Sequence, residues 1–366
     1  WLLDKKIQIS ELKYKSIFFL GSLSVALFAI LGQRESESFI TTQTFTIKDR
    51  ALYVIENLFF YIHKTIDPLN LSPFYPRTDI NILAPYFIMS FLIVISVFLL
   101  TLLFIKKRKN IPFIVTIACY VISVFPVLGI TLVGAQIRAV RWVYFPSVFL
   151  FFGTLLTILY LLHYKRSLRK YYFYIILCLM LLTTGYIYNT NKTIKVWKNT
   201  ETLFSEVIRK FPTQSPIPYN SLGLYFVIQS QYKDALINFN KGLAIDENYY
   251  KIYINRGVMN LKTKQFYSAL DDFNKAIMLN PKDKSTHLNA ALCLQRLKDY
   301  ENAAVRYKEV LKIDSRDVNA IAGIGYILHL RGQTADGLKK IQEAKGMRMR
   351  EWRVFFYEGN ILQELG

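Results

Sequence analysis

A 34-residue periodicity in the C-terminal part of this 366-residue chain constrains its fold more than any other feature. Small residues recur at the eighth and twentieth positions of each period, and an aromatic residue recurs at the twenty-fourth. These positions hold Gly223, Gly257 and Ala291, then Ala235, Ala269 and Ala303, then Phe239, Phe273 and Tyr307. Small residues let two helices approach closely, and a large ring fills the space left between them. The pattern predicts helix pairs stacked into an α-solenoid.

The period and the alternation of small and large residues are those of tetratricopeptide repeats. The register defines four repeats, at 216–249, 250–283, 284–317 and 318–351. The fourth departs from the pattern, because Gly337 replaces the alanine and Ile341 replaces the aromatic residue. Residues 352–366 read as the start of a further repeat. Residues 189–215 are expected to form a linker and a helix that caps the solenoid.

Long apolar runs fill residues 1–188, in a chain that is 52% hydrophobic and 15% aromatic. Such a composition is too apolar for one soluble domain. Five runs approach or exceed the length of a membrane-spanning helix: 16–32, 80–105, 111–133, 142–162 and 171–188. A signal peptide is the alternative for the first run, but no small-x-small cleavage site follows it. We predict an all-α protein, a multi-span transmembrane helical bundle of about five spans followed by the solenoid.

The basic residues of the short loops predict the orientation of these spans. Lysine and arginine cluster before the first run, at 106–109 and at 165–170. The cytoplasmic side of a membrane protein carries such clusters. We therefore expect the fragment's N-terminus to be cytoplasmic and the repeats to be extracytoplasmic, in a periplasm, an exterior or an ER lumen. More than half of the net charge of +20 lies within 1–188, which also predicts contact with anionic membrane lipid.

The predicted extracytoplasmic loop 33–79 is long for a connection, which is typical of loops with a function. Residues 50–64 have helical periodicity, with Ala51, Ile55 and Leu58 on one face and Tyr53 on another. Such a helix lies in the membrane interface or packs on the other spans. The sequence leaves both alternatives open.

Several functional classes lack their sequence signals. No basic stripe interleaves with stacking aromatic residues, so nucleic acid is not an expected partner. The three cysteines have neither disulfide nor zinc spacing, and the four histidines stand far apart, so we expect no metal site. Phosphate-binding glycine loops and metalloprotease motifs are absent too.

Short motifs add a resemblance to a known family. Arg141, Tyr144, Pro146 and Ser147 open the fourth predicted span, and the long loop and the repeats flank them in order. This arrangement resembles the C-terminal half of the transmembrane-and-tetratricopeptide-repeat protein O-mannosyltransferases and their bacterial relatives, which have the GT-C fold. The family usually carries Asp or Glu before this arginine, where the present chain has Val140.

The resemblance implies a transferase that uses a polyprenyl-phosphate sugar as donor and needs no other evident cofactor. Arg141, Arg138 and Tyr144 would then bind the donor phosphate, since a guanidinium matches phosphate oxygens bidentately. An interfacial membrane anchor is the alternative role for Arg141. The family's catalytic carboxylates lie in its first extracytoplasmic loop, and no equivalent is found here. We expect the chain to be a piece of a longer protein, with sequence missing at both ends.

First helices line the concave face of a repeat solenoid. From register, this face includes Asn220, Leu224, Ile254, Asn255, Val258, Leu261, Leu288, Asn289, Leu292, Gln295, Tyr326 and His329. Asn255 and Asn289 share the sixth position, and an amide both donates to and accepts from a peptide backbone. They predict a ladder that holds an extended or unfolded polypeptide, unless asparagine is simply common at that position.

Two functional hypotheses follow. The first is a C-terminal fragment of a membrane glycosyltransferase whose repeats present the acceptor polypeptide. The second is a non-catalytic, membrane-tethered repeat scaffold for protein–protein interaction in the envelope or the lumen. Because the catalytic carboxylates are missing, the sequence assigns no catalytic residue.

Overall fold

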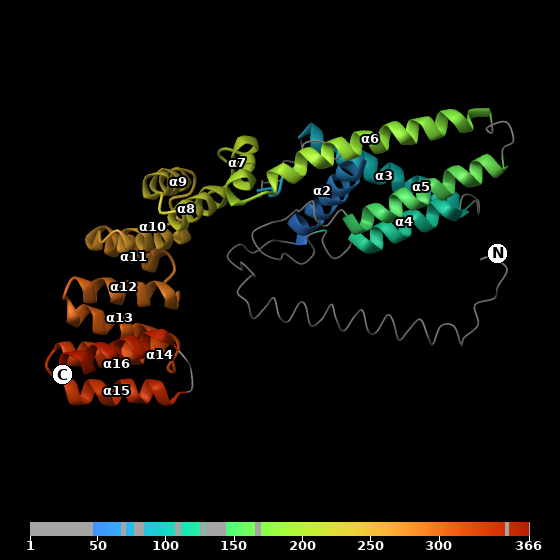
Figure 1. The fold of residues 1–366 in the computed structure, drawn as a ribbon. Coiled ribbons are helices and arrows are strands. Elements are labelled where there is room, and N and C mark those ends of the chain that lie inside the picture. The colour runs from blue at the N-terminus through green and yellow to red at the C-terminus, as the bar shows by residue number, and fades with distance from the viewer. Residues whose placement is uncertain are drawn as a thin grey trace, which may run out of the picture. The chain divides into compact units, whose positions relative to one another are not determined.

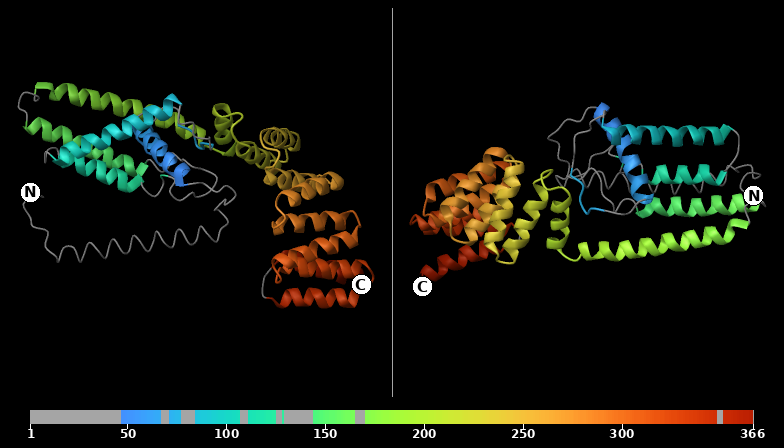
Figure 2. Two further views of the ribbon diagram at one scale, coloured as in Figure 1. Left: turned by 180° about the vertical axis from the view of Figure 1, so that it is seen from behind. Right: turned by 90° about the horizontal axis from the view of Figure 1, so that it is seen from above.

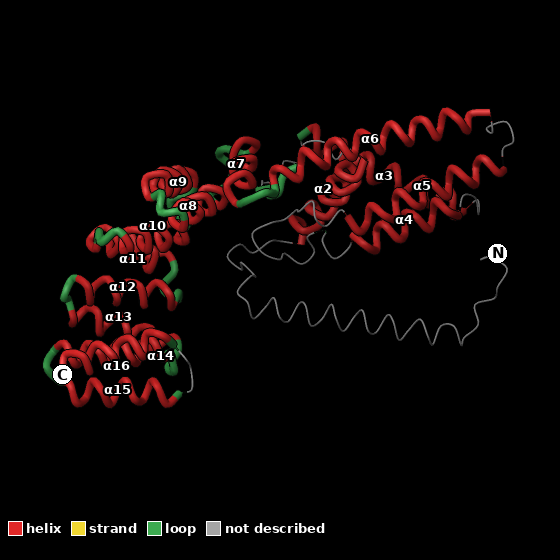
Figure 3. The backbone as a smooth tube through the Cα atoms, viewed as in Figure 1, coloured by secondary structure: helices red, strands yellow, loops and turns green. Residues whose placement is uncertain are grey.

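A computed structural model describes residues 47–66, 71–76, 84–106, 111–124, 128, 144–164, 170–347 and 351–365. Their regular elements are helices, as Figure 3 shows. The chain divides into two compact units, Trp1–Lys198 and Asn199–Gly366, which are described separately. The predicted boundary region 189–215 is shared between them, because the last helix of the first unit extends to Val196.

The first unit has five described helices (Figure 1). Four of them overlap predicted spans: α3 (Pro85–Lys106), α4 (Ile111–Val124), α5 (Tyr144–Tyr164) and α6 (Tyr172–Val196). The other, α2 (Ile47–Ile66), lies in the predicted loop 33–79. The predicted span at 16–32 lies outside the described residues. Among the residues described, α6 is the one helix that is long and apolar enough to cross a membrane. The five-span bundle therefore stays a prediction.

Helices α4 and α5 lie side by side in the first unit (Figure 1, Figure 2). Gly153 of α5 faces Thr116 of α4, and a Cβ atom at Gly153 would overlap the threonine side chain. Small residues allow such close approach between helices, both in water and in a bilayer.

Helix α2 packs on this part of the unit through an aromatic and polar face. Phe60 and Tyr61 of α2 share a buried cluster with Tyr120 of α4. The Asn57 amide donates a 2.8 Å hydrogen bond to the carbonyl oxygen of Leu128. Of the two alternatives for this helix, the structure therefore agrees with packing against the other helices of the unit. The face with Ala51 and Ile55 is less buried than the face with Asn57 and Tyr61.

The second unit is a succession of short antiparallel helices (Figure 1). It begins with α7 (Thr200–Lys210). The first helices of the repeats are α8 (Ile217–Ile228), α10 (Tyr250–Lys262), α12 (Lys284–Arg296), α14 (Val318–Leu330) and α16 (Trp352–Leu365). The second helices are α9 (Tyr232–Ile245), α11 (Phe266–Leu279), α13 (Tyr300–Ile313) and α15 (Thr334–Gly346). Each of the four predicted repeats therefore holds one helix pair. Helix α16 begins where the start of a further repeat is predicted.

The small-to-large contact inferred from the sequence joins the two helices of the first and second pairs. The ring of Phe239 lies against Gly223, and the ring of Phe273 lies against Gly257, so closely that a Cβ at either glycine would overlap the ring. The fourth pair keeps the same packing with different residues. A Cβ added at Gly337 would meet the carbonyl oxygen of Gly325 at 2.6 Å.

A left-handed residue joins the two helices of every repeat. These residues are Ser230, Lys264, Lys298 and Gly332, spaced by 34, with φ of 60°, 63°, 63° and 85°. After each one, the next backbone N–H donates to a carbonyl five residues earlier, as Gln333 does to Leu328 at 2.9 Å. This is the Schellman ending of a helix, in which the left-handed residue is usually glycine. Only the fourth repeat has glycine at this position.

The left-handed turns give a test of the repeat geometry. Gly332→Ala should lower the free energy of unfolding of residues 199–366 by about 1–2 kcal/mol, because a Cβ strains a positive φ. The measurement is urea denaturation followed by far-UV circular dichroism. Gly359→Ala is the matched control, because Gly359 lies within α16 with open space around it. It should be neutral or stabilise by about 0.5–1 kcal/mol. Equal effects of the two substitutions would contradict the assignment.

Candidate functional site

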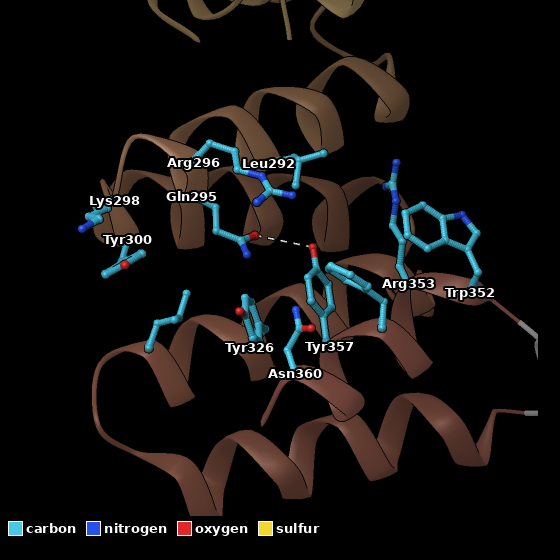
Figure 4. A pocket seen from close by; sticks show the side chains of 12 residues that line it. Leu292, Gln295, Arg296, Lys298, Tyr300, Tyr326, Trp352, Arg353, Tyr357 and Asn360 are labelled. Atoms are coloured by element: carbon cyan, nitrogen blue, oxygen red, sulfur yellow. Dashed lines mark hydrogen bonds between the residues drawn. The ribbon is translucent and has the colours of Figure 1, made fainter. Parts of the chain in front are cut away.

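A cavity of about 450 Å³ opens between three first helices, α12, α14 and α16 (Figure 4). Its lining combines large aromatic and aliphatic side chains with amides and cations. The lining residues are Leu292, Gln295, Arg296, Lys298, Tyr300, Tyr326, Leu330, Trp352, Arg353, Phe356, Tyr357 and Asn360. No acidic residue is among them. The cavity lies on the first-helix face, the surface that the first helices of the repeats form.

Aromatic rings from neighbouring repeats build one wall. Tyr326 of α14 stacks on Tyr357 of α16, with ring centroids 4.7 Å apart and an interplanar angle of 13°. Trp352 and Phe356, one turn apart on α16, meet edge to face at 6.0 Å. Both are exposed at their surfaces. Since stacked rings hold one another in place, this wall offers a preformed apolar surface to a ligand.

Beneath the wall lies a small hydrogen-bonded cluster. The Tyr307 hydroxyl is 3.3 Å from the Gln295 Oε1 atom and 3.3 Å from the Tyr357 hydroxyl. Tyr357 also donates to Gln295 Oε1 at 3.5 Å, as the dashed line in Figure 4 shows. These contacts use the oxygen of the Gln295 amide. Its N–H groups make no hydrogen bond with other described residues, so they remain available to an acceptor in the cavity.

Burial keeps both tyrosine hydroxyls neutral. It raises the pKa of Tyr357 above its ordinary value, against the opposing effects of the Tyr307 hydrogen bond and of Arg353 and Arg296. The pKa of Tyr307 is raised further, first by burial and then by the neighbouring Tyr357. At physiological pH the cluster therefore contributes hydroxyl groups and no negative charge.

Three cations around the cavity lack a carboxylate partner within the described part of the chain: Arg296, Lys298 and Arg353. Arg353 lies over the Trp352 ring, 5.6 Å from the centroid. Other basic side chains nearby contact carboxylates. His329 is 2.9 Å from Glu364, and Lys345 is 2.9 Å from Glu358. The cavity therefore carries positive charge that no described carboxylate neutralises.

The structure distributes the predicted concave residues over several environments. Leu292, Gln295 and Tyr326 line the cavity. Leu288 belongs to a buried core cluster, against which Ile324 packs from α14. Val258 and Leu261 pack against another core cluster. Leu224 is exposed at the surface, and Ile254 is partly buried.

The predicted asparagine ladder takes a different form. The Asn255 amide donates to Asn220 Oδ1 at 2.8 Å, which ties α10 to α8. The two residues therefore satisfy part of each other's hydrogen-bonding capacity. Asn289 is partly buried and makes no hydrogen bond with the described residues. His329 bonds Thr334 at 3.1 Å and Glu364 at 2.9 Å, so both its ring nitrogens are engaged.

Two of the three residues predicted to bind a donor phosphate lie outside the described residues. Arg138 and Arg141 lie outside the described residues, and Tyr144 is the first residue of α5. Within the described residues, no group of three or more His, Cys, Asp or Glu side chains is placed to hold a metal ion.

Sequence reasoning missed the contribution of α16 to the site. Its rings and Arg353 form much of the cavity, whereas the sequence pattern predicts only the start of a further repeat at 352–366. The signal was present in the register. One more step of 34 from Tyr326 reaches Asn360, and two steps from Asn289 reach Tyr357. Extending the predicted face by one helix would have found both.

Comparison with known proteins identifies the repeats. The tetratricopeptide repeat family matches residues 250–283, the second predicted repeat. These residues form a tetratricopeptide repeat. A search of curated proteins found no match.

Solved structures similar to the chain include three repeat proteins. A tetratricopeptide repeat protein from Parabacteroides merdae has 19% identity and a TM-score of 0.43, over 49% of this chain and 70% of its own. PilF of Pseudomonas aeruginosa has 16% identity and a TM-score of 0.39, over 50% and 82%. The first repeat domain of Spaghetti (RPAP3), bound to the HSP90 peptide SRMEEVD, has 22% identity and a TM-score of 0.32, over 33% and 95%.

Proposed function

We propose that this tetratricopeptide-repeat protein is an interaction scaffold that binds a segment of another polypeptide in the cavity between α12, α14 and α16. The observation that carries the proposal is the composition of this cavity. It combines exposed rings with amide N–H groups that make no hydrogen bond to described residues, and with cations that have no carboxylate partner among those residues. Its volume of about 450 Å³ falls within the range of binding clefts in proteins.

An extended polypeptide matches these groups one by one. Its apolar side chains would cover the exposed rings of Trp352 and Phe356, which otherwise remain in contact with water. Its backbone would exchange hydrogen bonds with the amides of Gln295 and Asn360. No nucleophile paired with a base and no metal cluster occurs in this lining, so the geometry favours binding over catalysis.

A charge placed in the cavity should weaken this binding. Leu292→Asp in the full chain should lower the affinity for a fluorescent, permanently unfolded polypeptide by about tenfold or more, because an apolar contact becomes a charge that must be desolvated. Fluorescence anisotropy in detergent solution measures the affinity.

The matched control is Met278→Asp. Met278 is 77% exposed and lies on α11, a second helix, so the same charge there should leave the affinity unchanged. Circular dichroism establishes that both variants are folded. Equal affinities for the wild-type chain and Leu292→Asp would reject the cavity as the binding site.

The second part of the proposal is that the first unit anchors the scaffold in a membrane, with the repeats outside the cytoplasm. Helix α6 is long and apolar enough to cross a bilayer, and none of its residues is buried within the unit. Outward apolar residues also cover α3 and α5, such as Phe98 and Phe152. The basic loop clusters described above supply the orientation.

Thiol labelling of intact cells tests this orientation. In a chain with Cys119, Cys178 and Cys293 replaced by alanine, Lys339→Cys should react with a membrane-impermeant maleimide. Lys107→Cys, on the opposite predicted side, should react only after permeabilisation. The reverse pattern would place the repeats in the cytoplasm.

The resemblance to membrane mannosyltransferases adds a second candidate function for the full-length parent protein. In it, the first unit would help bind a polyprenyl-phosphate sugar, and the repeats would present the acceptor. Full-length Arg141→Ala should then lose sugar transfer while Lys109→Ala, on the opposite predicted side, retains it. Transfer that persists in Arg141→Ala would reject the phosphate-binding role of this arginine.

A further inference from the structure

We propose that the cavity selects a polypeptide segment in which an apolar side chain lies between two acidic side chains. This inference rests on the proposed function and specifies the partner of the same site. It follows from how charge and apolar surface are arranged along the cavity.

The cations stand at separate places around the lining. In Figure 4, Lys298 lies at one end of the labelled residues and Arg353 at the other. Arg296 lies between them, on the α12 side. Two carboxylates of a ligand, one at each end, would form ion pairs with cations that have no carboxylate partner among the described residues. A guanidinium group binds a carboxylate by two parallel hydrogen bonds.

The middle of the cavity has a different character. Tyr326 and Tyr357 lie between the two ends in Figure 4. Their stacked rings, with Leu292 and Phe356, form an apolar surface where a charged side chain would be desolvated without a partner. An aliphatic or aromatic side chain fits this place. The order along the ligand is therefore acidic, apolar, acidic.

Amide groups fix the ligand backbone between these contacts. Gln295 uses its oxygen to accept from the tyrosine hydroxyls, so its N–H groups are left to donate to a peptide carbonyl. Asn360 makes no hydrogen bond with the described residues, and its amide offers both a donor and an acceptor. Such groups recognise an extended backbone without reading its side chains.

The lack of acidic residues in the lining strengthens the selection. A basic ligand would meet only like charge there, and like charge at close range is unfavourable in a partly desolvated site. Acidic residues near the site, such as Glu358 and Glu364, are already bound to Lys345 and His329. The selection is therefore electrostatic, and added salt should weaken it.

Three labelled seven-residue peptides test the inference with the full chain in detergent. The first has glutamate at its second and sixth positions, leucine at the fourth and glycine elsewhere. The second replaces both glutamates by glutamine, and the third replaces the leucine by glycine. We expect the first to bind at least about tenfold more tightly than either of the others, because each lacks one class of contact.

Charge-removing variants identify the cations responsible. Lys298→Gln combined with Arg353→Gln should abolish the preference for glutamate over glutamine. Lys282→Gln combined with Lys339→Gln removes the same charge from exposed positions outside the cavity and should preserve that preference. Circular dichroism establishes that each variant is folded.

The outcomes separate this inference from the proposed function. Equal affinities of the glutamate and glutamine peptides would overturn the acidic selection. The proposed function would still stand if Leu292→Asp weakened the binding of the unfolded polypeptide. Absence of binding by every peptide and by the unfolded polypeptide would overturn both.

Discussion

The contact between a small residue of one helix and a large side chain of the next is the constraint on which the repeat unit depends. Where Phe239 lies on Gly223, or Phe273 on Gly257, the two backbones approach more closely than any larger side chain would allow. These contacts join the first and second helices of a repeat. The cavity between α12, α14 and α16 is a consequence, because its lining residues are carried at fixed positions by those helices.

Much of the repeat unit was predictable because its packing repeats with its sequence. The register located all four helix pairs and the start of α16, since each small residue marks a close approach. The fourth pair kept its geometry although Gly337 and Ile341 break the pattern. Two glycines bring the backbones together there, and a branched aliphatic side chain replaces the ring.

Other features depend on contacts that the register does not encode. Ser230, Lys264 and Lys298 adopt positive φ although their side chains disfavour it. Because none of them is glycine, the sequence does not indicate these left-handed turns. The Asn255–Asn220 pair joins residues 35 apart, one more than the period, so stepping by 34 could not reveal it. Helix α2 buries Phe60 and Tyr61 against Tyr120, and its Asn57 bonds to Leu128; these partners are distant in sequence.

Photochemical crosslinking tests the central claim most directly, because it reports where a polypeptide binds. A photoreactive phenylalanine derivative placed at Tyr326, which lines the cavity, should crosslink a bound unfolded polypeptide. The same derivative at Tyr267, 77% exposed on the second helix α11, should give no such product. Equal crosslinking at both positions, or crosslinking only at Tyr267, would contradict the account.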